Sequence, residues 1–189
     1  TWATTTKSSA PIARRSIAST PACGRNSQRL SRPPGTTLPD PCTIRDFRDA
    51  DQAAVLAIIR DLQRHERRFD ERVKPPQEIG DWYIRELLAS AEKHNGRLLV
   101  AEVDGVVAGY ACLLVEVSSA YQREEILYTY SQVSDLAVLS AHRGHGLGRA
   151  LIAACEGIAC ADGQRWIRLG VLAANQDARR FYARSGFSE

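Results

Sequence analysis

The chain has 189 residues, of which 44% are hydrophobic and 25% are charged, the ordinary composition of one globular domain with its own core. Residues 1–39 hold six of the 25 basic side chains and none of the 22 acidic ones, so the remainder has a formal charge of −3. This distribution argues against nucleic-acid binding, which needs a basic patch on the folded part, and no uncharged run approaches the roughly 20 apolar residues of a membrane span.

Residues 1–40 differ in composition from residues 41–189, which we take as the domain. The first segment is rich in Ser, Thr, Pro and Arg and lacks a hydrophobic period. Such a composition buries too little apolar surface to offset the entropy lost on ordering. We therefore expect an N-terminal tail that is flexible or lies over the domain.

Residues 41–189 alternate between strand and helix patterns. The period of the apolar residues and the turn signals between them give the approximate boundaries. Acidic residues just before two of the helices are expected to cap them, Asp49 or Asp51 for the first and Asp81 for the second. In chain order we expect a strand at 43–48, helices at 53–69 and 81–96, a hairpin of 97–103 and 106–117, a central strand at 127–139, a helix through 147–158, a strand at 165–172 and a helix at 175–186.

This order of elements describes a single α/β domain. The hairpin makes the front half of the sheet antiparallel. We expect a mixed, mostly antiparallel central sheet flanked by about four helices.

The central strand leads into RGHGLG, where Gly144, Gly146 and Gly148 precede a helix. A strand, a glycine loop and a helix start can bind phosphate, because unpaired N–H groups and the positive end of the helix dipole converge there. The P-loop pattern requires a lysine and a hydroxyl after the last glycine, where this chain has Arg149 and then alanine. The dinucleotide pattern GxGxxG requires a third glycine further on and an acidic residue after the next strand, and both are missing.

Three motifs, in this order and separation, resemble the GCN5-related N-acetyltransferase (GNAT) family over residues 43–187. They are DLAV in the central strand, RGHGLG in the loop, and Asn175-x-x-Ala178-x-x-x-Tyr182 in the last helix. The resemblance implies a GNAT-like fold and an N-acetyltransferase with acetyl-CoA as co-substrate. It implies direct transfer of the acetyl group, in a ternary complex, to a primary amine of a small molecule or of a protein.

The resemblance also implies which residues bind the coenzyme. The glycines of the loop let main-chain N–H groups approach the pyrophosphate without a Cβ in the way, and its two arginines supply positive charge. The central strand offers main-chain groups to the pantetheine arm, as if to an added strand, and Asn175 contacts the arm from the other side. The expected set is Leu136, Ala137, Val138, Arg143, Gly144, His145, Gly146, Leu147, Gly148, Arg149, Asn175, Ala178 and Tyr182.

Two catalytic residues are expected. The resemblance makes Tyr182 the general acid, and its ordinary pKa of about 10 suits protonation of the leaving thiolate. Several family members use a glutamate of the central strand as base, where this chain has Gln132 and, three residues later, Asp135. We expect Asp135 as the base, although the alternation of the strand points it away from Leu136 and Val138. Glu124, Glu125 and the hydroxyls of Tyr128 and Tyr130 are the alternatives.

The acceptor is expected to be a small-molecule amine. In the family the first two helices and the loop before the central strand select it, and these segments are rich in acidic residues here, which favours a cationic amine. The alternative function is a catalytically weak sensor or partner module that binds acyl-CoA.

Three further expectations concern metals, compartment and assembly. The five cysteines form no CxxC pair, and His142 and His145 have no acidic or thiol neighbour, so we expect no metal and reduced thiols in a cytoplasmic protein. The family usually has one more strand after the last helix, whereas this sequence stops two residues after Phe187. Either that strand is trimmed from the sequence, or a second copy, as a homodimer, or the N-terminal tail fills that sheet edge.

Overall fold

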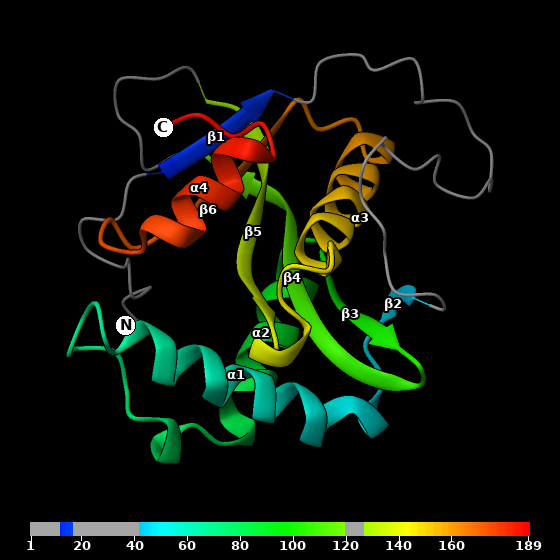
Figure 1. Ribbon diagram of the computed structural model, residues 1–189. Helices are drawn as coiled ribbons and strands as arrows, with labels where there is room; N and C mark the ends of the chain where they lie inside the picture. The colour runs from blue at the N-terminus through cyan, green and yellow to red at the C-terminus, as the bar shows by residue number, and fades with distance from the viewer. Residues whose placement is uncertain (1–11, 17–41, 120–126) are drawn as a thin grey trace.

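The computed structural model describes residues 12–16, 42–119 and 127–189, the first of these by backbone alone (Figure 1). Each strand and helix predicted within residues 41–189 is present. Short 3-10 helices at Asp49–Asp51, Pro76–Glu78 and Ser140–His142 supplement them. The elements are β1 (Ile12–Ser16), β2 (Cys42–Asp46), α1 (Gln52–Glu66), α2 (Asp81–Lys93), β3 (Arg97–Val103), β4 (Val106–Ser118), β5 (Thr129–Val138), α3 (Leu147–Ala161), β6 (Trp166–Gly170) and α4 (Gln176–Arg184).

The strands form one six-stranded sheet in the order β1-β6-β5-β4-β3-β2. Of these pairs, β5 and β6 are parallel and the others are antiparallel. Helix α3 connects β5 to β6, as parallel neighbours require a crossover. The predicted α/β fold with a mixed, mostly antiparallel sheet is confirmed.

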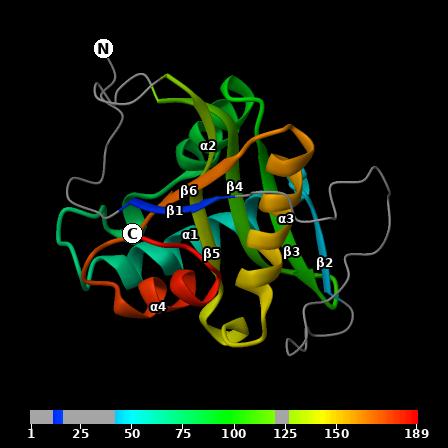
Figure 2. The ribbon, with the colours of Figure 1, turned by 90° about the horizontal axis from the view of Figure 1, so that it is seen from above.

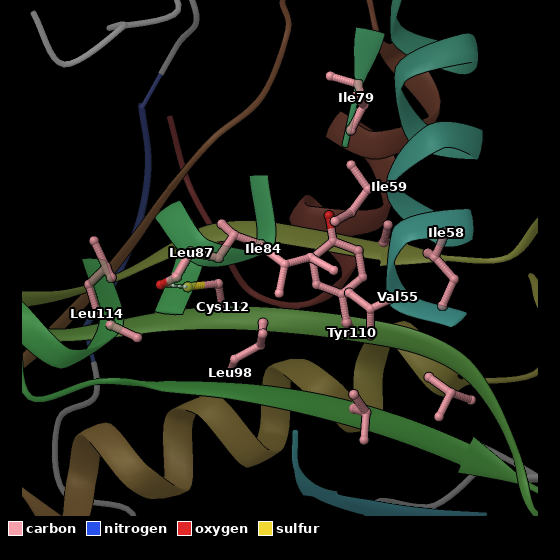
Figure 3. Close-up of a cluster of buried hydrophobic side chains, with 14 residues drawn as sticks. Val55, Ile58, Ile59, Ile79, Ile84, Leu87, Leu98, Tyr110, Cys112 and Leu114 are labelled. Carbon is pink, nitrogen blue, oxygen red and sulfur yellow. Dashed lines mark hydrogen bonds between the residues drawn. The ribbon is translucent and has the colours of Figure 1, made fainter. Parts of the chain in front are cut away.

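Helices α1 and α2 cover one face of the sheet (Figures 1 and 2). The apolar residues of α1 follow helical spacing, with Val55, Ile58 and Ile59 turned inward. Figure 3 shows these side chains around Tyr110 of β4, with Ile84 of α2 on the other side of its ring. Tyr110 is fully buried, so its hydroxyl must find a partner inside the protein.

Helices α3 and α4 lie on the opposite face (Figure 2). Leu151 and Cys155 of α3 are completely buried against the sheet. Phe181 and Tyr182 of α4 pack, partly buried, against the same cluster. In both views the second half of β5 runs between α3 and α4 (Figures 1 and 2).

Strand β1 lies within the segment predicted as a tail, where no strand was predicted. Its five residues pair antiparallel with the whole of β6, from Ile12 opposite Gly170 to Ser16 opposite Trp166. Of the two ways in which this edge was expected to be filled, the structure has the N-terminal segment. The rest of residues 1–40 lies outside the described residues.

Strand β5 contains a bulge that changes which face its side chains point to. Cys112 lies opposite Asp135 and Leu113 lies opposite Val133, which leaves Ser134 as an extra residue on β5. Val133 therefore belongs to the α3 face, whereas Asp135 turns to the face covered by α1 and α2.

The expected helix caps are wrong in detail. Asp51 is the N-cap residue of α1 but makes no capping hydrogen bond to that helix, because its carboxylate instead accepts from the Arg48 N–H (2.8 Å). Asp81 is the first residue of α2, and its N-cap is Gly80.

Candidate active site

The glycine loop joins the end of β5 to the start of α3. Gly144 has a φ of 83°, and Gly146, the N-cap of α3, has a φ of 84°, a left-handed conformation that side chains with a Cβ rarely adopt. The first N–H groups of an α-helix have no partner within it, and the positive end of the helix dipole lies there. The loop thus presents donors and partial positive charge where the sequence predicts the pyrophosphate.

Gly148 brings α3 and α4 together. A Cβ at this position would lie 3.1 Å from Cζ of Phe181, closer than nearly all real contacts allow. The first turn of α3 therefore packs directly against the residue before Tyr182. This contact ties the position of the predicted general acid to the predicted phosphate loop.

Arg143 folds back onto β5 and α1. Its Nε donates to the Val138 carbonyl (2.9 Å), and its NH2 group lies 3.3 Å from the Asp61 carboxylate. The guanidinium thus links the loop to the helix expected to select the acceptor. His145 is exposed in the same loop, and Arg149 is half-buried in the first turn of α3.

The second half of β5 is paired with β4 but not with β6. Within the described strands, β5 and β6 pair only at residues 131–133, while β5 continues to Val138. Leu136 and Val138 are half-buried beside the α3 and α4 cluster, and Ala137 faces α1 and α2. The main-chain groups of residues 134–138 on the β6 side are therefore the ones that an extended ligand could pair with.

Asn175 begins α4. Its side-chain oxygen accepts a hydrogen bond from the Ala178 N–H (3.1 Å), and the residue is buried. The Asn175-x-x-Ala178 motif thus has a direct structural role as an N-cap. Because Tyr182 is about one helical turn after Ala178, this cap also helps to fix the position of Tyr182 on α4.

Tyr182 is a protonated phenol at neutral pH. Burial raises its pKa well above the ordinary value, and the negative charges of Asp135 and Glu66 raise it further. Its ring lies between Phe181 and Phe187, with centroid separations of 5.1 and 6.0 Å. A phenol held in this way is protonated and can donate a hydrogen bond, although its raised pKa makes it a weaker acid than an ordinary tyrosine.

Asp135 lies among hydroxyl groups on the α1 and α2 face. One carboxylate oxygen accepts from the Tyr83 hydroxyl of α2 (2.6 Å), and the other accepts from the Tyr110 hydroxyl of β4 (3.0 Å). Asp135 does point away from Leu136 and Val138, and its negative charge still raises the pKa of Tyr182, which packs on the opposite face. The structure thus brings the two predicted catalytic residues within electrostatic reach of each other.

Three residues of this site were missed by the sequence analysis as individual functional residues. They are Tyr83, Tyr110 and Glu66, the last of which is 8% exposed at the end of α1. Burial raises the pKa of Tyr83, and the charges of Asp135 and Glu66 contribute. Glu66 was noticed only as one acidic residue among many, and a tyrosine in an apolar helix or strand pattern gives no signal that separates it from core.

The alternative bases do not gather around Asp135. Tyr128 and Tyr130 stack on the buried Arg168 guanidinium, with Arg168 Cζ 5.3 and 4.3 Å from the ring centroids. Gln132 lies opposite Arg168 in the sheet. Glu124 and Glu125 lie outside the described residues. Asp135 is therefore the carboxylate of β5 that the structure relates to Tyr182.

No group of three or more His, Cys, Asp or Glu side chains that could hold a metal occurs in residues 42–119 and 127–189. Among the helices that the structure describes, none is long and apolar enough to cross a membrane.

Comparison with known proteins identifies the family. A model of the acetyltransferase (GNAT) family matches residues 56–187, and the chain belongs to this family. The matched residues run from α1 to just beyond α4 and include every candidate site residue described above.

The relatives and solved structures named below share 30% or less of their aligned residues with this chain. The uncharacterized N-acetyltransferase MJ1207 of Methanocaldococcus jannaschii is 30% identical over 124 residues, 65% of this chain, and the chain spans 51% of that relative. The ribosomal-protein-alanine N-acetyltransferase of Brucella melitensis is 25% identical with a TM-score of 0.61, over 78% of this chain and 85% of that one. The yncA protein of Salmonella typhimurium, whose structure contains its cofactor acetyl-CoA, is 26% identical with a TM-score of 0.57, over 78% and 79% of the two chains.

Proposed function

We propose that the protein is an acetyl-CoA-dependent N-acetyltransferase that acts on a primary amine. The observation that best supports this function is the convergence of three features on the second half of β5, where β5 pairs with β4 and has separated from β6. The glycine loop lies at its end, Tyr182 lies on one face and Asp135 turns to the other. Membership of the acetyltransferase family agrees with this function.

The residues present suit acetyl-CoA. The left-handed glycines and the N-terminus of α3 would bind the pyrophosphate, with Arg149 in the first turn adding charge. Residues 136–138 would pair with the pantetheine arm, and Asn175 and Ala178 would border it from α4. The coenzyme supplies an acetyl thioester. Arg143, now bonded to Val138 and Asp61, would exchange Asp61 for a phosphate at little cost, because that pair is exposed.

The chain's own side chains address the two proton transfers of the reaction. The acceptor nitrogen forms a bond to the acetyl carbon while the carbon–sulfur bond breaks, so the nitrogen loses a proton and the sulfur gains one. Tyr182 is the proton donor to sulfur. Asp135 accepts the proton of the amine, directly or through water, which matters because a lysine-like amine with a pKa near 10.4 is neutral in only about one molecule in 2,500 at pH 7.

The acidic groups near the site favour a cationic acceptor. Glu66 and Asp135 are close enough to raise the pKa of two tyrosines, and Asp61 lies at the loop. Such a field attracts an ammonium ion before its deprotonation.

A panel of primary amines tests the activity through release of the coenzyme A thiol. The panel includes polyamines, aminoglycosides, free amino acids and peptides that begin with alanine or contain lysine. We expect turnover with at least one cationic amine, and less than about one hundredth of it in Tyr182→Phe. Binding of acetyl-CoA without turnover of any amine would instead support the sensor or partner module.

A further inference from the structure

The Asp135 carboxylate is held by two tyrosines that reach it from different parts of the chain. Tyr83 lies in α2, 52 residues before Asp135, and its hydroxyl is 2.6 Å from one carboxylate oxygen. Tyr110 lies in β4, 25 residues before Asp135, and its hydroxyl is 3.0 Å from the other. With both oxygens bonded, the carboxylate has one orientation.

The two tyrosines differ in what else they do. Tyr110 is fully buried in the α1 and α2 core, so its ring packs and its hydroxyl needs Asp135 as a partner (Figure 3). Tyr83 is only partly buried at the edge of the same cluster. Its neighbours Ile84 and Leu87 anchor α2 in the core without it. Its hydroxyl is the buried end of the side chain, since burial is the largest cause of its raised pKa, and its short bond joins α2 to the carboxylate of β5.

Both hydroxyls are donors. Burial and then the charge of Asp135 raise the pKa of each phenol well above its usual value. A carboxylate that accepts two hydrogen bonds is fixed in place, and charge-assisted hydrogen bonds of this kind are short and strong. Because α2 belongs to the layer that covers this face of the sheet, the bond from Tyr83 links that helix to the reacting strand.

We propose that Tyr83 is a positioning residue, which fixes the Asp135 carboxylate for proton removal from the acceptor amine. The inference rests on the proposed acetyltransferase function. Tyr83 acts only through Asp135, so its contribution exists only while Asp135 is a carboxylate. Misplacing a catalytic group by a fraction of an ångström to an ångström lowers the rate of the chemical step more than the binding of either substrate.

A double-mutant cycle tests the proposal with the best acceptor of the amine panel. Tyr83→Phe removes one oxygen atom and leaves the ring, and we expect it to lower kcat about tenfold, the effect of one hydrogen bond to a charged group. The KM for acetyl-CoA should stay unchanged. In an Asp135→Asn background, the same substitution should change kcat by less than about twofold, because the interaction is already lost.

The control is Leu88→Ala, which alters another position of α2. Leu88 is 37% exposed and lies five residues after Tyr83, so its side chain is remote from the bond to Asp135. Its effect on kcat, whatever its size, should be the same with and without the Asp135→Asn change. All variants are first compared with the wild type by circular dichroism and by their melting temperatures.

Two results would overturn the proposal. Equal loss of kcat from Tyr83→Phe in both backgrounds would make Tyr83 a structural residue, and an unchanged kcat would leave it without a role in the reaction. Failure of the proposed function looks different, because the wild type itself would then acetylate no amine. In that case Tyr83 positions nothing, and the inference fails with it.

Discussion

Gly146 is the residue whose backbone most constrains the phosphate loop. Its φ of 84° places it in the left-handed region, at the N-cap of α3. Gly146→Ala should cost about 1–2 kcal/mol of stability from backbone strain, and we also expect loss of acetyl-CoA binding, measured by calorimetry. Gly163→Ala is the matched control, because Gly163 has a φ of 76°, open space around it and a position at the far end of α3. Gly163→Ala should lose similar stability and keep its affinity for acetyl-CoA. Equal affinity for acetyl-CoA in both variants would mean that the loop is not part of the binding site.

Tyr182→Phe separates chemistry from packing. The ring stays between Phe181 and Phe187, so the fold should be unaffected. Loss of a general acid should lower kcat by about 10²- to 10⁴-fold, with little change in the KM for acetyl-CoA. Steady-state kinetics and thermal scans provide the measurement, and a kcat within threefold of the wild type would require a different proton donor.

The motifs that the sequence reveals are those in which neighbouring residues act together. The glycine loop and Asn175-x-x-Ala178-x-x-x-Tyr182 are local, so their spacing alone predicts them, and the structure provides the backbone conformation and the cap that they need. Tyr83, Tyr110 and Asp135 act together across 52 residues of chain. No local pattern reports such a contact, because it depends on how α2 packs on the sheet.

The junction of β2 and α1 contains a partly buried ion pair. Arg45 donates to both Asp51 carboxylate oxygens (2.7 and 2.9 Å) and also bonds to Glu102. The Arg45 hydrogen bonds hold the pKa of Asp51 below its ordinary value of 3.8. The stabilisation is therefore complete above pH 3.8 and is lost as the pH falls through the lower folded pKa.

Asp51→Asn should destabilise the fold by about 1–3 kcal/mol at pH 7, because Arg45 loses a two-oxygen partner and keeps the Glu102 carboxylate. The loss of stability on acidification below pH 4 should also become shallower than in the wild type. Urea unfolding between pH 2.5 and pH 7 measures both effects. Asp46→Asn is the control, since its pair with Arg97 is exposed and should contribute less than about 1 kcal/mol. Equal effects of the two substitutions would contradict this account of the junction.

At the level of elements, the periodic segments were predictable and the irregular ones were not. Helix α1 follows from apolar spacing, and the β3–β4 hairpin follows from Asp104-Gly105. The bulge at Ser134 has no such signature, although it decides which face Asp135 points to. Strand β1 was missed because it has five residues and owes its conformation to the edge of β6, which is distant in sequence.

The whole molecule depends on β1 to cover one edge of the sheet. Deletion of residues 1–16 should expose the edge of β6 and cause association that increases with concentration, because unpaired strand edges invite pairing. Deletion of residues 1–11 leaves β1 intact and serves as the control. Light scattering over a hundredfold concentration range compares the two. Identical mass and identical melting temperature in both deletions would mean that β1 does not protect this edge.

The central claim is that the loop after β5 binds acetyl-CoA, and a thermal unfolding scan with acetyl-CoA, ATP and NAD at equal concentrations tests it without knowledge of the acceptor. A ligand at about 100 times its dissociation constant adds about 2.7 kcal/mol, which raises the melting temperature of a domain of this size by roughly 5 to 10 °C. We predict such a rise with acetyl-CoA and a smaller one, or none, with ATP and NAD. No rise with acetyl-CoA, or a larger rise with either nucleotide, would contradict the assignment of the loop and the mechanism that depends on it.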